Sequence, residues 1–207
     1  MRSAVLHRAL NAVHDKAVFS RRVEVLSRHL ADMIPRGEGS LLDLGAGDGS
    51  IASRIGAHHP GLEVQGVDVL LRPRTHVPVS LYDGTTLPFE TDSFDWVSIV
   101  DVLHHTDDPG AVLAEAARVA RRGVLVKDHL REGVLAGPTL RAMDWVGNRG
   151  HGVRLPYNYL SEAEWDAVLA HCGLVARERR TVLSLYPPVI DSVFGRRLHF
   201  IARYAKR

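Results

Sequence analysis

The stretch LLDLGAGDGS, residues 41–50, decides the fold class. It is a short apolar run that ends in three closely spaced glycines, Gly45, Gly47 and Gly49, with the acidic residue Asp43 just before them. A strand, a glycine turn and a helix in succession are typical of nucleotide-binding α/β proteins, because glycine lets the backbone approach a ligand closely. The sequence therefore predicts a ligand site at the end of this strand.

Strand and helix patterns alternate along the rest of the chain. Apolar runs predict strands, and capped amphipathic segments predict helices. The expected strands are SLLDLG (40–45), LEVQGVDV (62–69), VPVSLYD (77–83), FDWVSIVDVL (94–103) and GVLVKD (123–128). The expected helices cover 50–58, run from Asp108-Pro109 to Arg121-Arg122 before Gly123, and run from a capping box at Ser161 to Gly173.

Two more strand-like segments, 174–184 and 197–204, follow each other without a helix between them. Strand–helix–strand repeats with short connections predict a doubly wound, mostly parallel sheet. We therefore expect an α/β, Rossmann-like fold with seven strands, an antiparallel C-terminal hairpin at one edge and a helical cap. Ligands bind such sheets beyond the carboxyl ends of the strands, so the residues there are the candidates for chemistry.

Composition places the chain among ordinary globular proteins. Its 207 residues suffice for a single domain, 1–207, and a net charge of +2 does not require a nucleic-acid partner. The one cysteine, Cys172, excludes an internal disulfide and fits a reducing cytoplasm. No apolar stretch approaches the roughly 20 residues that span a bilayer. We expect a cytoplasmic protein without a membrane span, and a homodimer stays open.

The spacing of the glycines and the charges around them indicate which ligand the loop binds. A dinucleotide fingerprint needs G-x-G-x-x-G, but Ser50 stands where the third glycine should fall, and no P-loop lysine follows. Asp43 and Asp48 would repel a phosphate at the helix N-terminus that otherwise welcomes one. A ligand with an ammonium group and no phosphate, such as S-adenosylmethionine, fits these charges better.

Further segments follow the loop in a recognisable order: VQGVDV, LYDGTTLPFETDSFDWVSIVDVLHHTDDP and VLAEAARVARRGVLVKD. With them, residues 41–173 resemble the class I S-adenosylmethionine-dependent methyltransferases, and among these the small-molecule group related to ubiquinone and menaquinone C-methyltransferases. One departure is Arg122-Gly123, where the family usually has a proline–glycine pair. The resemblance implies S-adenosylmethionine as the cofactor and methyl transfer as the reaction.

The resemblance also implies a set of cofactor-binding residues. The glycine turn would cradle the methionine part, the end of the second strand would hold the ribose hydroxyls, and the next segment would meet the adenine ring. These residues are, in that order, Asp43, Gly45, Ala46 and Gly47, then Asp68 and Val69, then Asp83 and Gly84, with Asp101 at the end of the fourth strand. Structural alternatives remain: the glycines can serve only a tight turn, Asp68 can be a cap, and Asp-Gly is a common turn pair.

The acceptor side is less defined. Methyl transfer needs an aligned acceptor, exclusion of water and, for a hydroxyl acceptor, a base. Imidazole titrates near neutral pH, so the candidate catalytic residues are His105, His129 and His104, of which His105 and His129 lead by position. The alternative is that these histidines contact the cofactor or only pack.

Two segments outside the sheet are expected to cover the site. The first is residues 1–37, where apolar residues recur at helical spacing over 5–13 and 19–33. The second is a lid, residues 129–159, with an amphipathic helix carrying Val134, Leu135, Leu140, Met143, Trp145 and Val146. Polar groups in this lid are Asp144, Asn148, His151, Tyr157, Asn158 and Tyr159, and Gly147, Gly150 and Gly152 would let it move.

The expected function is O- or C-methylation of a small aromatic or lipid-like metabolite. Metal-dependent catechol-type O-methyltransferases compete as a model, but they have Asp-Asn where Asp128-His129 stand, so we expect no metal. Methylation of RNA or protein is a further alternative, although DVLHHTDDP replaces the Asn/Asp-Pro-Pro-Tyr motif of nucleobase methyltransferases. Binding of S-adenosylmethionine without catalysis is another. The sequence leaves the acceptor open.

Overall fold

The computed structural model describes residues 20–147, 155–188, 191, 194–195 and 197–207. A helix over residues 20–33 corresponds to the second expected N-terminal helix, and its inner residues Leu26 and Leu30 are buried. The expected helix over 5–13 lies outside the described residues, and so do four expected lid residues: Asn148, Gly150, His151 and Gly152.

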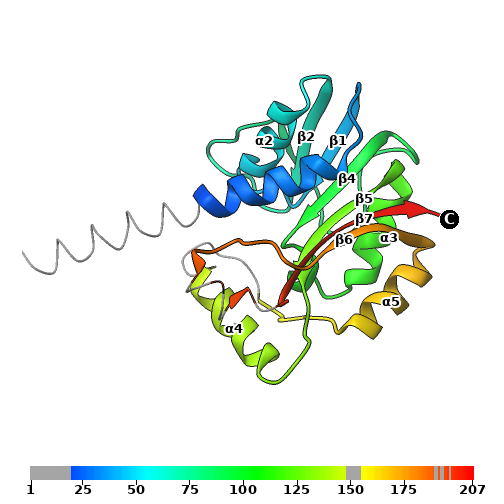
Figure 1. Ribbon diagram of the computed structural model, residues 1–207. Helices are drawn as coiled ribbons and strands as arrows, with labels where there is room; N and C mark the ends of the chain where they lie inside the picture. Colours follow the sequence, from blue (N-terminus) through cyan, green and yellow to red (C-terminus); the bar gives the residue numbers. More distant parts are fainter. Residues whose placement is uncertain (1–19, 148–154, 189–190, 192–193, 196) are drawn as a thin grey trace, which may run out of the picture.

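The described residues form a seven-stranded sheet in the order β3-β2-β1-β4-β5-β7-β6. The strands are β1 (Gly39–Leu44), β2 (Leu62–Asp68), β3 (Val79–Leu81), β4 (Phe94–Val100), β5 (Ala120–His129), β6 (Leu174–Arg180) and β7 (His199–Lys206). Strands β1 to β5 are parallel, whereas β7 is antiparallel to both β5 and β6 (Figure 1). The expected sheet, with its C-terminal hairpin at one edge, is confirmed.

Capping residues begin the helices where the sequence predicts. The α-helices after the first are α2 (Ser50–His58), α3 (Pro109–Val119), α4 (Ala136–Gly147) and α5 (Glu162–His171), and a short 3₁₀ turn, η1, covers Leu103–His105. The Asp108 side chain accepts a hydrogen bond from the Ala111 backbone N–H, and Ser161 and Glu164 form the expected capping box. None of the described helices is long and apolar enough to cross a membrane.

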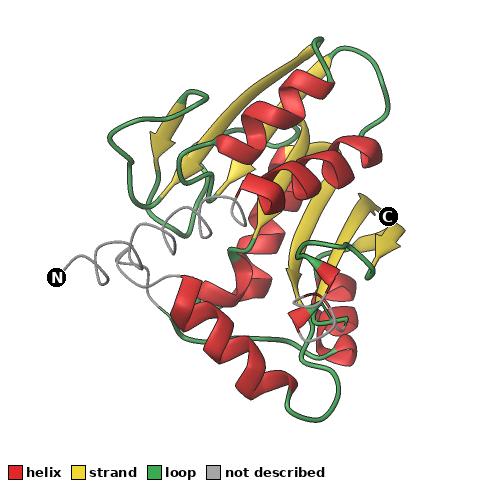
Figure 2. Cartoon of the chain, turned by 60° about the vertical axis from the view of Figure 1, so that its left-hand side comes forward, coloured by secondary structure: helices red, strands yellow, loops and turns green. Residues whose placement is uncertain are grey.

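Apolar residues alternate between the two faces of the sheet, so each face has its own core. Leu41 of β1 packs with Leu30 and the other inner residues of helix 20–33 and with α2, whereas the next residue, Leu42, packs with Leu113 of α3 and Trp165 of α5. Figure 2 shows helices on both faces and α4 standing apart from them. The covering of both faces explains the continuous apolar runs of the central strands.

The expected end of one helix and the expected bounds of several strands are wrong. Helix α3 stops at Val119, and Arg121 and Arg122 belong to β5. Gly123 lies inside that strand rather than ending the helix. A Cβ at this position would overlap the backbone oxygen of Tyr204 on β7. Close pairing of β5 with β7 therefore requires this glycine. Strand β3 is shorter than 77–83, β4 ends at Val100 rather than at 103, where η1 begins, and β6 ends at Arg180 rather than at 184.

Strand β1 lies between β2 and β4, and the strand order reverses there. The chain leaves β1 for α2 on one side of this point and leaves β4 for η1 on the other. A crevice at the carboxyl ends of β1 and β4 is the place where doubly wound sheets bind ligands.

Candidate active site

A cleft of about 180 Å³ opens at this crevice. The glycine loop after β1 forms one wall, the end of β4 forms another, and helix 20–33 covers a third side. The lining residues are Arg22, Val23, Leu26, Asp43, Gly45, Ala46, Gly47, Asp48, Ser50, Ile51, Val100 and Asp101. The structure thus brings five of the predicted cofactor residues together, Asp43, Gly45, Ala46, Gly47 and Asp101, and adds Arg22, which the sequence reasoning missed.

Backbone hydrogen bonds hold the glycine loop against the end of β2. The Gly45 and Ala46 N–H groups donate to the Val67 oxygen at 2.8 and 3.1 Å, and the Gly47 N–H donates to Asp68 Oδ2 at 2.8 Å. Gly45 has a φ of 76°, in the left-handed region that favours glycine. Asp68 therefore lies beside the loop, as a ribose-binding residue would, and its role stays a prediction.

Asp43 is a buried carboxyl group at the floor of the cleft. The Ser98 hydroxyl donates a hydrogen bond to its Oδ1 at 2.7 Å. Burial is the main cause that raises the pKa of Asp43 to about 7. The nearby Asp68 charge also raises this pKa, whereas the Ser98 hydrogen bond lowers it. The group is poised between its neutral and charged forms near neutral pH, so a cation in the cleft would favour the carboxylate.

The predicted adenine-side residues lie on the surface beyond the walls of the cleft. Asp83 is exposed and accepts hydrogen bonds from the backbone and hydroxyl of Thr85 and from the backbone of Thr86, which lower its pKa. A Cβ at Gly84 would lie 3.1 Å from a methyl carbon of Val69, so these two predicted residues are neighbours. Asp83 closes a turn here, and its contact with an adenine ring stays a prediction.

An ion-pair network joins the cleft to the core. Asp101, which lines the cleft, pairs with Arg22 of helix 20–33 and with Lys127, a fully buried residue of β5. Burial alone would raise the pKa of Asp101, but the Arg22 and Lys127 charges hold it well below its usual value. Burial lowers the pKa of Lys127 despite this partner. A lysine near the end of an otherwise apolar strand, GVLVKD, indicates that a buried partner is needed, but it does not identify Asp101 as that partner.

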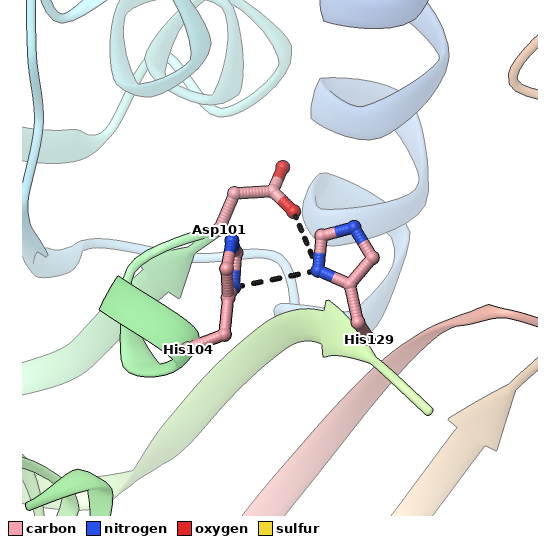
Figure 3. Close-up of side chains that lie close together, drawn as sticks. All are labelled: Asp101, His104 and His129. Atoms are coloured by element: carbon pink, nitrogen blue, oxygen red, sulfur yellow. Dashed lines mark hydrogen bonds and ion pairs between the residues drawn. The ribbon is translucent and has the colours of Figure 1, made fainter. Parts of the chain in front are cut away.

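Three buried polar residues, His104, Asp128 and His129, form a cluster next to Asp101. His129 Nδ1 is 3.8 Å from Asp101 Oδ1 and 3.3 Å from His104 Nδ1. Figure 3 shows the three side chains pointing toward one another. His104 Nδ1 is also 2.7 Å from Asp128 Oδ1. The predicted catalytic residues His104 and His129 therefore meet one another and the predicted cofactor residue Asp101, although neither histidine is among the residues that line the cleft.

The two histidines have opposite electrostatic surroundings. Burial and the Lys127 charge lower the pKa of His129 to about 4, so its ring is neutral at neutral pH. Burial opposes protonation of His104 as well, but the carboxylates of Asp128 and Asp144 outweigh it and raise the pKa of His104 to about 10. Burial and the positive charge on His104 lower the pKa of the third candidate, His105.

Helix α4 of the predicted lid contributes Asp144 to this group. The Tyr159 hydroxyl donates to Asp144 and, at 3.1 Å, to the Leu140 oxygen. Leu140 and Asp144 are one helical turn apart and face inward, whereas Trp145 lies about 100° further round the helix and is 55% exposed. The expectation that Trp145, Val134 and Leu135 pack over the site is therefore wrong for this structure, in which all three are exposed.

His199 of β7 completes the cluster and was missed from the sequence. Its ring centroid lies 4.8 Å from that of His129, and it is buried. Burial and the Lys127 charge hold its pKa well below the usual value for histidine. Only the pairing of β7 with β5, which sets His199 opposite His129, reveals this neighbour.

A model of a family described as a methyltransferase domain matches residues 42–126. The matched segment runs from β1 into β5 and contains the glycine loop, Asp68, Asp101 and two of the three candidate histidines, His104 and His105. The chain is 33% identical to a ubiquinone biosynthesis O-methyltransferase of Hahella chejuensis over 97 residues, 40% of this chain and 39% of that protein. It is 30% identical to a demethylmenaquinone methyltransferase of Renibacterium salmoninarum over 138 residues, 59% of this chain and 57% of that protein.

Among solved structures, one similar chain comes from the complex between the Haloferax volcanii Trm112 methyltransferase activator and a methyltransferase. The TM-score is 0.69 at 18% sequence identity, with 93% of each chain covered, which supports the fold. The matched part spans about half the length of the curated relatives. The expected resemblance to class I S-adenosylmethionine-dependent methyltransferases is confirmed, and S-adenosylmethionine is the cofactor that this resemblance supports.

Proposed function

We propose that this methyltransferase-like chain transfers the methyl group of S-adenosylmethionine to oxygen or carbon of a small aromatic or lipid-like metabolite. One observation carries the proposal: the segment that matches the family contributes the glycine loop and Asp101, and these residues form the walls of the same cleft. We also propose a cytoplasmic location, which the single cysteine supports.

The residues of the cleft fit this cofactor. Asp43 and Asp48 offer carboxyl groups for an ammonium, and a Cβ at Gly47 would meet no atom within 4 Å, so this glycine leaves open space beside the loop. Asp68 Oδ2 already accepts a hydrogen bond from the loop, which orients this carboxylate at the edge of the cleft. When bound, S-adenosylmethionine supplies a methyl group on a positively charged sulfur. The protein then has to orient the acceptor and exclude water.

The lining of the cleft and the relatives support the acceptor class. Val23, Leu26, Ile51 and Val100 give the cleft an apolar part next to the charged pair of Arg22 and Asp101. Apolar walls suit an aromatic ring or a prenyl chain better than a sugar. Two relatives are named for methyl transfer in ubiquinone biosynthesis and to demethylmenaquinone, and these names support a quinone-like acceptor.

For a hydroxyl acceptor, we propose that His129 takes up the proton. Its ring is neutral at neutral pH and lies behind Asp101, which reaches the cleft. His104 keeps a proton between Asp128 and Asp144, so it is suited to position His129 through their 3.3 Å contact. His105 stays a second candidate, although it lies against His104 rather than in the cleft wall.

A turnover assay tests the proposal. The full chain is incubated with S-adenosylmethionine and a panel of hydroquinones with and without prenyl tails, phenols, catechols, total RNA and a peptide library, and S-adenosylhomocysteine is measured by mass spectrometry. We expect S-adenosylhomocysteine together with a methylated small molecule from the panel. His129→Gln should lower kcat for a hydroxyl acceptor about 100-fold or more. His58→Gln, an exposed residue of α2, is the matched control.

Two outcomes contradict the proposal. Methylation of only RNA or peptide would assign the chain to another acceptor class. Binding of S-adenosylmethionine with no S-adenosylhomocysteine from any acceptor would support a non-catalytic binding protein. Equal turnover and equal pH dependence in His129→Gln would exclude His129 as the base while leaving methyl transfer in place.

A further inference from the structure

A group of three side chains next to the cleft has metal-ligand chemistry that methyl transfer does not use. His104 and His105 come from η1, and Asp144 comes from α4. One ring nitrogen of each histidine and one carboxylate oxygen lie within 4.8 Å of one another. The rings of His104 and His105 are 4.0 Å apart between centroids. Residues far apart in the sequence thus converge on one point between η1 and α4.

Two of the three candidate donor atoms are buried and lack a hydrogen bond. His104 Nε2 and His105 Nδ1 have no hydrogen-bond partner within the described part of the chain. His104 is almost fully buried, and its Nε2 is 3.4 Å from Asp144 Oδ2 without hydrogen-bond geometry. Within the described residues, His105 Nδ1 therefore has no partner and His104 Nε2 has only its ion pair with Asp144, and buried polar atoms nearly always have a hydrogen-bond partner. A metal ion would take this place and release the proton that Asp144 helps His104 to retain.

Asp128 and Tyr159 hold two of the three side chains in place through hydrogen-bond contacts. His104 Nδ1 is 2.7 Å from Asp128 Oδ1, which fixes the ring and directs Nε2 toward Asp144. The Tyr159 hydroxyl donates to Asp144. A carboxylate on the far nitrogen of a metal-binding histidine is the usual arrangement, because it sets the tautomer and makes the ligand more basic.

We propose that His104 Nε2, His105 Nδ1 and Asp144 bind one divalent transition-metal ion of the zinc, cobalt or iron(II) type. Ligands at 2.0–2.1 Å in a tetrahedral site lie about 3.3 Å apart, and the 3.4 Å between His104 Nε2 and Asp144 Oδ2 agrees with that spacing. Imidazole donors select these ions over magnesium, which prefers oxygen ligands. Asp101 and Asp128-His129, the positions at which we expected no magnesium, are not part of this group.

A second grouping, Asp101, His104 and His129, is a poorer site. Asp101 is already paired with Arg22 and Lys127, and these charges would repel a cation. His104 faces this grouping with its Nδ1, and this nitrogen is already hydrogen-bonded to Asp128. The cation therefore belongs on the α4 side of His104, where a bound ion would tie the lid helix to η1.

Cobalt titration of the untagged, chelator-treated full chain tests the site. We expect visible ligand-field bands that saturate at one Co²⁺ per chain and disappear when Zn²⁺ is added. His105→Gln should weaken Co²⁺ binding at least tenfold, and Asp128→Asn should weaken it about 10–100-fold. His58→Gln is the matched control and should leave binding unchanged, with far-ultraviolet circular dichroism to verify folding of each variant.

X-ray absorption on the zinc-loaded wild-type chain gives a readout that does not depend on any variant. We expect imidazole nitrogen scattering with first-shell distances of about 2.0–2.1 Å. The absence of saturable binding, or a first shell of oxygen alone, would overturn the proposal. So would binding that His129→Gln abolishes and His105→Gln retains, because the ion would then lie at the Asp101 grouping. None of these measurements requires methyl transfer.

Discussion

At the scale of single residues, the protonation state of Asp43 is coupled to the binding of a positively charged ligand in the cleft. The Asp43 pKa of about 7 reflects a carboxyl group that is buried, with the Ser98 hydroxyl as its hydrogen-bond partner. An unfolded aspartic acid titrates near 3.9, so the folded chain holds an extra proton between about pH 4 and 7 and loses stability as pH rises through that range. A positively charged ligand beside Asp43 removes this proton.

We therefore predict that S-adenosylmethionine binding releases about one proton at pH 6, and that its affinity rises as pH rises from about 5 to 7, where the ligand stays an ammonium ion. The ammonium of the ligand favours the carboxylate, which lowers the pKa of Asp43 in the complex. Calorimetry at pH 6 in two buffers of different ionisation enthalpy measures the released proton. Asp43→Asn should abolish the release, whereas Asp48→Asn, in the same cleft, should keep it. Buffer-independent heats at pH 6 would contradict this role of Asp43.

The residues of the site differ in how far the sequence predicts them. The glycine loop and Asp101 follow from local spacing, because each comes directly after an apolar strand. Arg22 and Lys127 do not, since their pairing with Asp101 joins three elements that only the sheet order and the packing of helix 20–33 bring together. His199 depends in the same way on antiparallel pairing with β5.

At the scale of elements, Gly123 shows how tertiary contact overrides a local signal. A glycine after Arg121-Arg122 predicts a helix end, yet it lies inside β5, where Tyr204 of β7 passes too close for any side chain. The strand begins three residues earlier because this close pairing, and not the glycine's helix-ending tendency, decides the local structure. Capping residues, in contrast, predict the starts of α3 and α5 correctly, since their hydrogen bonds are local.

Gly123→Ala should lower the free energy of unfolding by about 1–3 kcal/mol, because the added methyl group forces β5 and β7 apart. Gly137→Ala in α4 is the matched control: a Cβ there meets no atom within 4 Å, so the change should be neutral or stabilise by up to about 1 kcal/mol. Urea denaturation of both variants measures the difference. Equal stability of the two variants would contradict the requirement for glycine at this position of β5.

At the scale of the whole molecule, the doubly wound sheet could be predicted because strand and helix periods alternate regularly from β1 to β5. The order of the strands places two groups of functional side chains next to each other at the carboxyl ends of the strands. One is the glycine-loop cleft between β1 and β4, and the other is the histidine and aspartate cluster between η1, β5 and α4. The position of α4 could not be predicted, since its inward side is set by the contacts of Leu140 and Asp144 with Tyr159.

The central claim is that the glycine-loop cleft binds S-adenosylmethionine, and calorimetric titration of the full chain tests it most directly. We predict saturable binding of one S-adenosylmethionine per chain, and loss of that binding in Gly47→Trp, whose side chain would project from the loop that lines the cleft. Circular dichroism verifies that the variant is folded. No binding to the wild-type chain, or equal affinity for Gly47→Trp, would contradict the account.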